Sequence, residues 1–197
     1  VASNTSTSPT GTTTGDALIE DATASVTHRV SQTYSFEIGK QYTWSVYAQP
    51  RIGTREILLQ LGNTAFPSAC QQEFDIATGV LGTTDAGADY ASIQAVGGGW
   101  YRCSLTGTAT STTSASAVVY LMNAFNPTYT GDGTSNVALW GAQLEESPGA
   151  TSYLKTEATS LTEGELQVPN TPTAESAVSP AVPRTPTAEA ICPMPRT

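Results

Sequence analysis

The chain has 197 residues and a net charge of −9, and only 13% of its residues are charged. This length suits one domain of ordinary size with an appendage, and the low charge content disfavours long surface helices, whose exposed faces need Glu, Lys and Arg. The acidic balance argues against a nucleic-acid partner, which requires clustered Lys and Arg, and against an anionic membrane surface. No apolar run reaches the roughly 18 residues that would span a bilayer.

Residues 1–14, VASNTSTSPTGTTT, form a polar lead in front of the first predicted strand. After this lead, polar and apolar residues alternate in segments separated by turn residues at intervals of about 10–15 residues, which is typical of an all-β sandwich or jelly roll. The predicted strand segments are 24–37, 41–49, 55–62, 71–82, 90–109, 114–123 and 136–145. We therefore predict an all-β fold, a jelly-roll β-sandwich of two antiparallel sheets, over residues 15–156.

Alternation also predicts which side chains face the core. In segment 41–49 four side chains alternate with polar neighbours and are expected to point inward: Tyr42, Trp44, Val46 and Ala48. The same alternation in the closing strand predicts that Trp140 and Leu144 are buried. Trp100 follows a run of three glycines, a turn that could expose its ring. Cys70 and Cys103 leave two alternatives open, a disulfide between them or a buried free Cys103.

The composition changes sharply after residue 156. Residues 157–197 contain no Phe, Trp or Tyr, hold seven of the twelve prolines, and repeat the pentapeptide TPTAE. Such a segment has too little apolar surface to offset its ordering entropy, and its Pro, Thr and Ala content favours extended conformations. We predict an extended C-terminal arm that contacts neighbouring subunits, with a plain linker as the alternative.

The residue types needed for catalysis are sparse. His28 is the single histidine, and the acidic neighbours Glu20–Asp21 and Glu145–Glu146 point to opposite faces of a strand, so neither pair can flank one sugar. No nucleophile or phosphate-binding motif occurs. The chain is therefore expected to be no enzyme and to need no cofactor, and His28 is expected to be packed or half-exposed on a strand.

A calcium site is the one metal site that the sequence suggests. Asp16, Glu20 and Glu145 lie at the two ends of the predicted module, and the first and last strands of a β-sandwich often meet at a hard cation held by carboxylates and backbone carbonyls. The alternative is that these exposed strand ends carry ordinary solvated acids.

Aromatic side chains on loops suggest a glycan site. Phe125 and Tyr129 lie in the long polar loop NAFNPTYTGDGTSN, together with Asn126 and Asp132, whose side chains can bind hydroxyl groups. Tyr90 is a further candidate at the start of a predicted strand. Loops on a rigid sandwich commonly carry binding sites. The alternative is a simple turn closed by a packed aromatic side chain.

Four blocks of the sequence together resemble a known family. These are SPTGTTTGDALIEDATASVTHRV, GKQYTWSVYAQP, GGGWYRCSLTGTAT and YTGDGTSNVALWGAQLEESPGATSYLKT, which extend in this order from Ser8 to Thr156. They resemble the jelly-roll, carbohydrate-binding-module-like domains that occur in bacteriophage tail-fibre and head-decoration proteins and in some secreted bacterial proteins. Family copies often begin with a further strand before the first block, where this chain has only the residues VASNTST.

The resemblance implies a function and partners. It implies a virion structural protein, a capsid decoration (cement) or tail-fibre component, which contacts other virion subunits and assembles as a homo-oligomer, with a trimer favoured. A surface glycan is an implied further ligand, and no nucleic acid or membrane is expected. The alternative is an extracellular glycan-binding module of a secreted bacterial polysaccharide-active protein.

Overall fold

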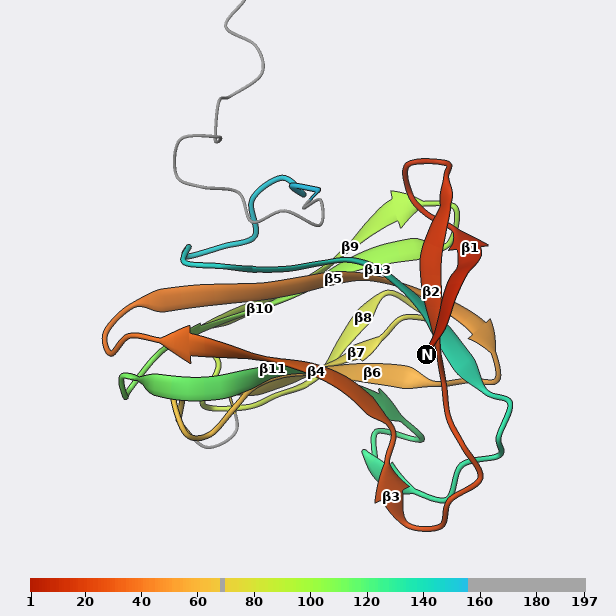
Figure 1. Cartoon of the computed structure of the whole chain (residues 1–197), viewed down its shortest axis with the longest axis horizontal. Coiled ribbons are helices and arrows are strands. Elements are labelled where there is room, and N and C mark those ends of the chain that lie inside the picture. Colours follow the sequence, from red (N-terminus) through yellow and green to blue (C-terminus); the bar gives the residue numbers. More distant parts are fainter. Residues whose placement is uncertain (68–69, 156–197) are drawn as a thin grey trace, which may run out of the picture. The chain divides into compact units, whose positions relative to one another are not determined.

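The computed structural model describes residues 1–67 and 70–155, and all their regular structure is β-strand (Figure 1). This confirms the predicted all-β fold. Within these residues no helix is long and apolar enough to cross a membrane. The predicted arm, residues 157–197, lies outside the described residues.

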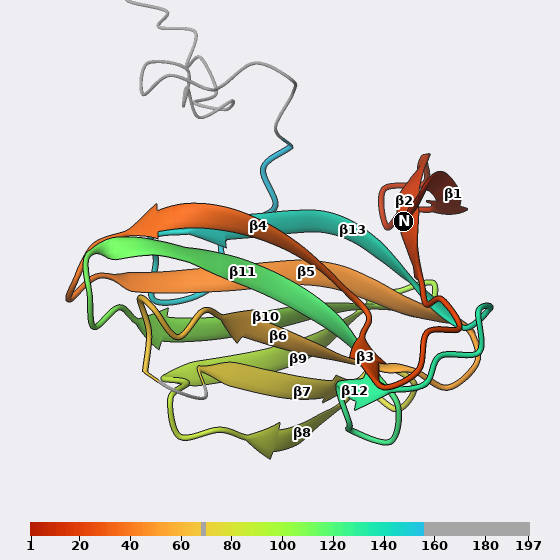
Figure 2. The same ribbon diagram turned by 60° about the horizontal axis from the view of Figure 1, so that its bottom comes forward.

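Two antiparallel sheets form the sandwich (Figure 2). In the six-stranded sheet the order is β1 (Ala2–Thr7), β2 (Thr13–Ile19), β13 (Asn136–Glu145), β5 (Gln41–Ile52), β10 (Trp100–Thr108) and β9 (Tyr90–Gly97). In the five-stranded sheet it is β4 (Arg29–Phe36), β11 (Thr113–Met122), β6 (Glu56–Leu61), β7 (Gln71–Asp75) and β8 (Val80–Thr84). A small sheet pairs β12 (Thr128–Tyr129) with β3 (Val26–Thr27).

The strand order is that of a jelly roll. One sheet contains the run β2-β13-β5-β10 and the other contains the run β4-β11-β6-β7, so neighbours within a sheet are distant in the sequence. Apart from the β6–β7 hairpin, the chain changes sheet at each step from one of these strands to the next. Two nested Greek keys of this kind define the jelly roll. Strand β1 extends one sheet at the β2 edge, while β8 and β9 extend both sheets at the opposite side.

The core lies between the sheets, and its aromatic centre is near the β4–β5 turn. The ring of Phe36 packs edge to face against Tyr42 and Phe66, with centroids 4.8 Å apart in both pairs. The four side chains that alternation predicted to point inward from β5 are all buried. Cys70 and Cys103 are buried free thiols, so the alternative without a disulfide is correct. Burial raises the pKa of the Cys70 thiol to about 12.

The polar lead belongs to the fold. Residues Ala2–Thr7 form β1 and pair with β2, so the expected separation of residues 1–14 from the sandwich is wrong. This hairpin covers Trp100, whose indole nitrogen donates to the Thr7 carbonyl at 3.1 Å. Trp100 is therefore buried, and the glycine turn before it does not expose the ring.

A β-bulge in β13 overturns the prediction for Trp140. The register against β5 shifts between Trp140 and Gln143, where Gly141 has a φ of 60°. One extra residue reverses the alternation, so Leu139 before the bulge and Leu144 after it both pack against the core. Trp140 instead lies on the outer face, half-buried against Tyr153 at a centroid distance of 4.5 Å. Leu144 faces the core as predicted.

Candidate functional site

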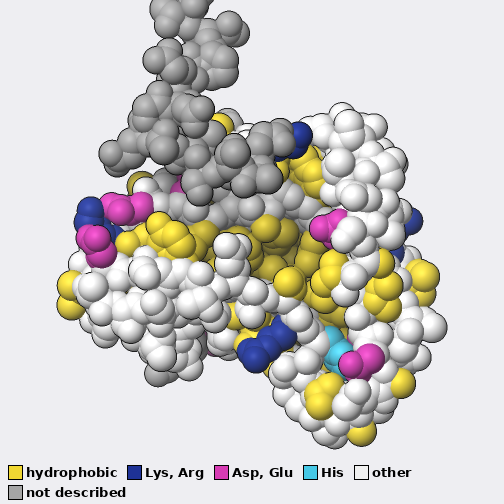
Figure 3. Space-filling model, in the orientation of Figure 1, with side chains coloured by type: hydrophobic (Ala, Val, Ile, Leu, Met, Phe, Trp, Pro, Cys, Tyr) yellow, Lys and Arg dark blue, Asp and Glu magenta, His cyan; other side chains and the backbone are white. Residues whose placement is uncertain are grey.

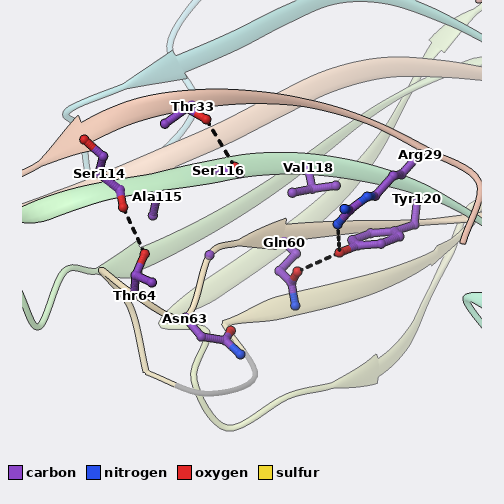
Figure 4. Close-up of a pocket in the computed structure, with 11 residues that line it drawn as sticks. Arg29, Thr33, Gln60, Asn63, Thr64, Ser114, Ala115, Ser116, Val118 and Tyr120 are labelled. Atoms are coloured by element: carbon purple, nitrogen blue, oxygen red, sulfur yellow. Dashed lines mark hydrogen bonds between the residues drawn. The ribbon is translucent and has the colours of Figure 1, made fainter.

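A polar groove of about 370 Å³ lies on the outer face of the five-stranded sheet (Figure 4). Strands β4, β11 and β6 supply most of its lining, and the turn after β6 closes one end. The side chains that line it are Arg29, Thr33, Gln60, Asn63, Thr64, Ser114, Ala115, Ser116, Val118 and Tyr120.

The groove is polar because the outward positions of two paired strands carry hydroxyl groups. Successive strand residues point to opposite faces, and β4 pairs with β11 through eight residues without a register shift. Thr33 lies beside Ser116 and Ser35 beside Ser114, with oxygen–oxygen distances of 3.4 and 3.3 Å. The alternate residues of β11 point inward and are buried in the core. The groove therefore has a rigid floor.

A chain of hydrogen bonds crosses one end of the groove. Arg29 Nη1 donates to the Tyr120 hydroxyl at 3.2 Å, and this hydroxyl donates to Gln60 Oε1 at 3.1 Å. Gln60 Nε2 in turn donates to Gln71 Oε1 at 2.8 Å. The Arg29 guanidinium also lies over the Tyr120 ring, 5.6 Å from its centroid. These contacts hold amide, hydroxyl and guanidinium groups in fixed directions (Figure 4).

The chemistry of this lining suits recognition of hydroxyl groups. Amide and hydroxyl side chains both donate and accept hydrogen bonds, as sugar hydroxyls do. Among the described residues that line the groove there is no carboxylate, so the groove itself offers no acid–base pair. The sequence reasoning missed this site. The sequence feature that could have indicated the groove is the alternation of Ser and Thr in residues 31–35 and 114–116. Ordinary solvent-exposed strand faces show the same alternation, so it does not identify a site.

The predicted glycan residues do not form one site. Tyr129 is buried and Asp132 closes its own turn, accepting hydrogen bonds from the backbone nitrogens of Thr134 and Ser135 at 2.7 Å each. Phe125 is 40% exposed and lies beyond the end of β11, while Tyr90 is 60% exposed at the other end of the sandwich, opposite Thr106. Asn126 Oδ1 accepts the Thr128 backbone N–H within the loop.

Tyr129 and Asp132 make internal contacts and do not point to a ligand, because both lie around a buried carboxylate. Glu20 is 2% exposed and accepts hydrogen bonds from Arg55 Nε and Nη2 at 2.7 and 2.8 Å. The Tyr129 hydroxyl and the Asp132 backbone N–H donate to the same carboxylate at 2.7 Å each. We call Glu20, Arg55, Tyr129 and Asp132 the Glu20 cluster. It joins the end of β2 to the β5–β6 turn and the loop before β13.

The cluster perturbs the ionisation of its members. Burial alone would raise the pKa of Glu20, but the hydrogen bonds from Arg55, Tyr129 and Asp132 outweigh it and lower that pKa. Burial and then the bond to Glu20 raise the pKa of Tyr129 well above its ordinary value. His28 packs beside the cluster, with its ring centroid 4.8 Å from that of Tyr129, in agreement with the prediction of a packed histidine.

The three predicted calcium ligands lie apart. Glu20 is held by Arg55, and Asp16 accepts the backbone N–H of Asn4. Asp16 pairs with Leu139, six residues before Glu145 on β13, which corresponds to about 20 Å along the strand. Glu145 accepts bonds from Thr151 instead. The structure therefore does not bring this set together, and residues 1–67 and 70–155 hold no other cluster of three His, Cys, Asp or Glu side chains suited to a metal.

Fold and groove together define a class, a jelly-roll β-sandwich with a polar groove on one sheet. Comparison with protein-family models gives no match for this chain, and comparison with curated proteins gives none either. The resemblance described above therefore remains a prediction in all respects except the fold.

Proposed function

We propose that this chain is a non-enzymatic virion structural protein, a capsid decoration or fibre component, whose jelly-roll body binds a glycan in the groove of the five-stranded sheet. The observation that carries the proposal is the groove itself. It presents amide and hydroxyl side chains on the outer face of a regular sheet, where a glycan can lie along the strands.

The charge of the protein favours a neutral glycan over an acidic one. The net charge is −9, whereas the groove contributes the single cation Arg29, which already bonds Tyr120. The negative charge of the protein would thus repel a polyanion. The Arg29 guanidinium, which already contacts Tyr120, would do little to offset this repulsion. We expect neutral hexose or N-acetylhexosamine polymers to be the ligand class.

The virion role is supported by the family resemblance and by the jelly-roll topology, which virion and carbohydrate-binding domains share. The groove equally favours the second candidate, a glycan-binding module of a secreted bacterial polysaccharide-active protein. Particle association separates the two candidates, because a virion protein co-purifies with particles at a fixed number of copies and a secreted module does not.

Glycan binding is tested on an array with the full chain and two single variants. Tyr120→Phe removes the hydroxyl that connects Arg29 to Gln60, and we expect it to weaken binding of the selected glycan by about tenfold, equivalent to one hydrogen bond. Phe125→Ala is the control, because its ring lies outside the groove and is expected to leave the affinity unchanged. If binding survives Tyr120→Phe but is lost in Phe125→Ala, the ligand binds to the loop, and the proposal that it binds in the groove is wrong.

The predicted arm is tested by deleting residues 157–197. Every aromatic residue precedes this segment, and the described residues 1–67 and 70–155 form a buried core among themselves, so we expect an unchanged cooperative melt. Particles reconstituted with the truncated protein are expected to lose it on washing, since the arm is proposed to contact neighbouring subunits. Retention equal to that of the full chain would exclude an attachment role for the arm.

A further inference from the structure

Strand β4 is an exposed sheet edge whose single charged side chain, Arg29, lies at its first residue. Among residues 1–67 and 70–155 it is the first strand of its sheet and pairs only with β11, through eight consecutive residues without a bulge. Its sequence RVSQTYSF contains no proline, glycine, lysine or acid. Natural proteins usually interrupt such an edge with one of these devices, because its free backbone groups invite another strand.

The other sheet edges are less regular. Strand β1 pairs with β2 through two register shifts and contains Asn4 at a φ of 55°. Strand β8 has five residues, includes Gly82 and meets β7 through a register shift. Strand β9 pairs regularly for six residues and ends in a bulge opposite Trp100. Strand β4 therefore offers the longest uninterrupted edge.

The hydrogen-bond pattern shows which backbone groups of β4 are free. Leu121 donates its backbone N–H to the His28 carbonyl at 2.8 Å, and bonded pairs alternate along an antiparallel ladder. Even-numbered residues of β4 thus bond to β11, and the backbone groups of four odd-numbered residues point outward: Arg29, Ser31, Thr33 and Ser35. The series stops there, because the Glu37 backbone N–H donates to the Tyr42 hydroxyl.

The core-facing side chains of β4 remain open to solvent at this edge. Val30 is 39% exposed and Tyr34 is 52% exposed, although their neighbours on β11, Val119 and Ala115, are buried. The opposite sheet leaves them uncovered because β2 pairs with β13 over only four residues, Asn136–Leu139. Figure 3 shows hydrophobic side chains along the recess between the two sheets.

From these observations we infer that β4 pairs antiparallel with β4 of a second copy of this chain across a two-fold axis. The outward-pointing backbone groups of these four residues can pair with the same four residues of a second copy in one register. In this register Arg29 lies opposite Ser35 of the second copy and Ser31 lies opposite Thr33. In this register Val30 meets Tyr34 of the second copy, so the exposed apolar side chains cover each other. No like charges face each other, and Gln32 lies on the axis.

An isologous contact of this kind closes after two copies and joins the two five-stranded sheets into one. It also places the two polar grooves on a single face, since Arg29 and Thr33 belong to both β4 and the groove. The inference stands independently of glycan binding, because the pairing uses backbone edges and core-facing side chains. It differs from the trimer that the family resemblance implies.

Disulfide trapping tests the register. Gln32 and its symmetry mate would form a non-hydrogen-bonded pair with Cα atoms about 4.5 Å apart, a separation that a disulfide accepts. In a Cys192→Ser background, in which Cys70 and Cys103 are buried, we expect Gln32→Cys to form a covalent dimer under mild oxidation. Ser35→Cys is the control, because its two copies would lie about 20 Å apart. Equal cross-linking of both variants would overturn the register.

Sedimentation of the full chain tests the contact without cysteines. We expect a concentration-dependent dimer, and Gln32→Lys is expected to weaken it at least about tenfold by placing two like charges directly opposite each other. Gln94→Lys, on the exposed edge strand β9, is the matched control and should leave the dimer intact. A monomer at all concentrations, a trimer that persists in Gln32→Lys, or a dimer broken only by Gln94→Lys would each overturn the inference.

Discussion

Replacing Glu20 by Gln is expected to lower the free energy of unfolding by about 3–5 kcal/mol. The Glu20 side chain is fully buried and the Arg55 side chain is 10% exposed, so the substitution leaves a desolvated guanidinium without its partner. Gln keeps the shape of the side chain but directs an N–H₂ group toward donors that need an acceptor. Urea unfolding monitored by tryptophan fluorescence measures the change.

The exposed ion pair of the same chain is the control. Lys40 and Glu146 approach to 2.7 Å, but both side chains are about half exposed. Solvent screens such a pair, and the entropy of holding two long side chains offsets most of its attraction. Glu146→Gln is therefore expected to leave the midpoint of unfolding nearly unchanged. A comparable loss in both variants would show that the buried cluster has no special role.

The stability difference between Glu20→Gln and the wild type should depend on pH. The pKa of Glu20 is lowered in the fold from an unfolded value of about 4.5, so its contribution is fully present above about pH 5 and is lost as the pH falls through the folded pKa. The glutamine of the variant carries no proton that titrates in this range. We expect the difference in unfolding free energy to be constant above about pH 5 and to shrink as the pH falls below it, and a difference that stays constant in acid would contradict the assignment.

Replacing Phe36 by Ala is expected to destabilise the protein by about 3–5 kcal/mol. Its ring is 1% exposed and packs against Tyr42, Phe66 and Tyr34, so removing it deletes apolar contacts and leaves a cavity between the sheets. Because Phe36 ends β4, we also expect faster amide hydrogen exchange along the β4–β11 ladder. Denaturant unfolding and hydrogen exchange measure the two effects.

Ile38 provides the matched control for Phe36. It lies two residues further along, and its side chain is 64% exposed. Ile38→Ala should change the free energy of unfolding by no more than about 0.5 kcal/mol, as is usual for surface positions. If Phe36→Ala were equally mild, the aromatic cluster near the β4–β5 turn would not be part of the core that stabilises the sandwich.

Alternation of polar and apolar residues predicted most strands of the two sheets but missed β1 and β2, which lie in and beside the polar lead. Side-chain direction reverses at every residue of a regular strand, so the buried positions of β5, from Tyr42 to Ala48, could be read locally. The same reasoning failed at Trp140, because one extra residue at the Gly141 bulge moved its ring to the outer face. The glycine turn before Trp100 was a poor guide to its exposure for another reason, because the β1–β2 hairpin covers the ring from a distant part of the chain.

By itself, the sequence determined the all-β class and the inner face of a regular strand such as β5, because both depend on neighbours a few residues apart. Only the tertiary structure decided the sites. Tyr129 meets Glu20 across 109 positions and Arg55 meets it across 35, so loop residues that suggested ligand binding became internal partners. The polar groove and the open β4 edge arose in the same way, since strand order in a jelly roll joins segments that are distant in the chain and no local pattern records which edge remains unpaired.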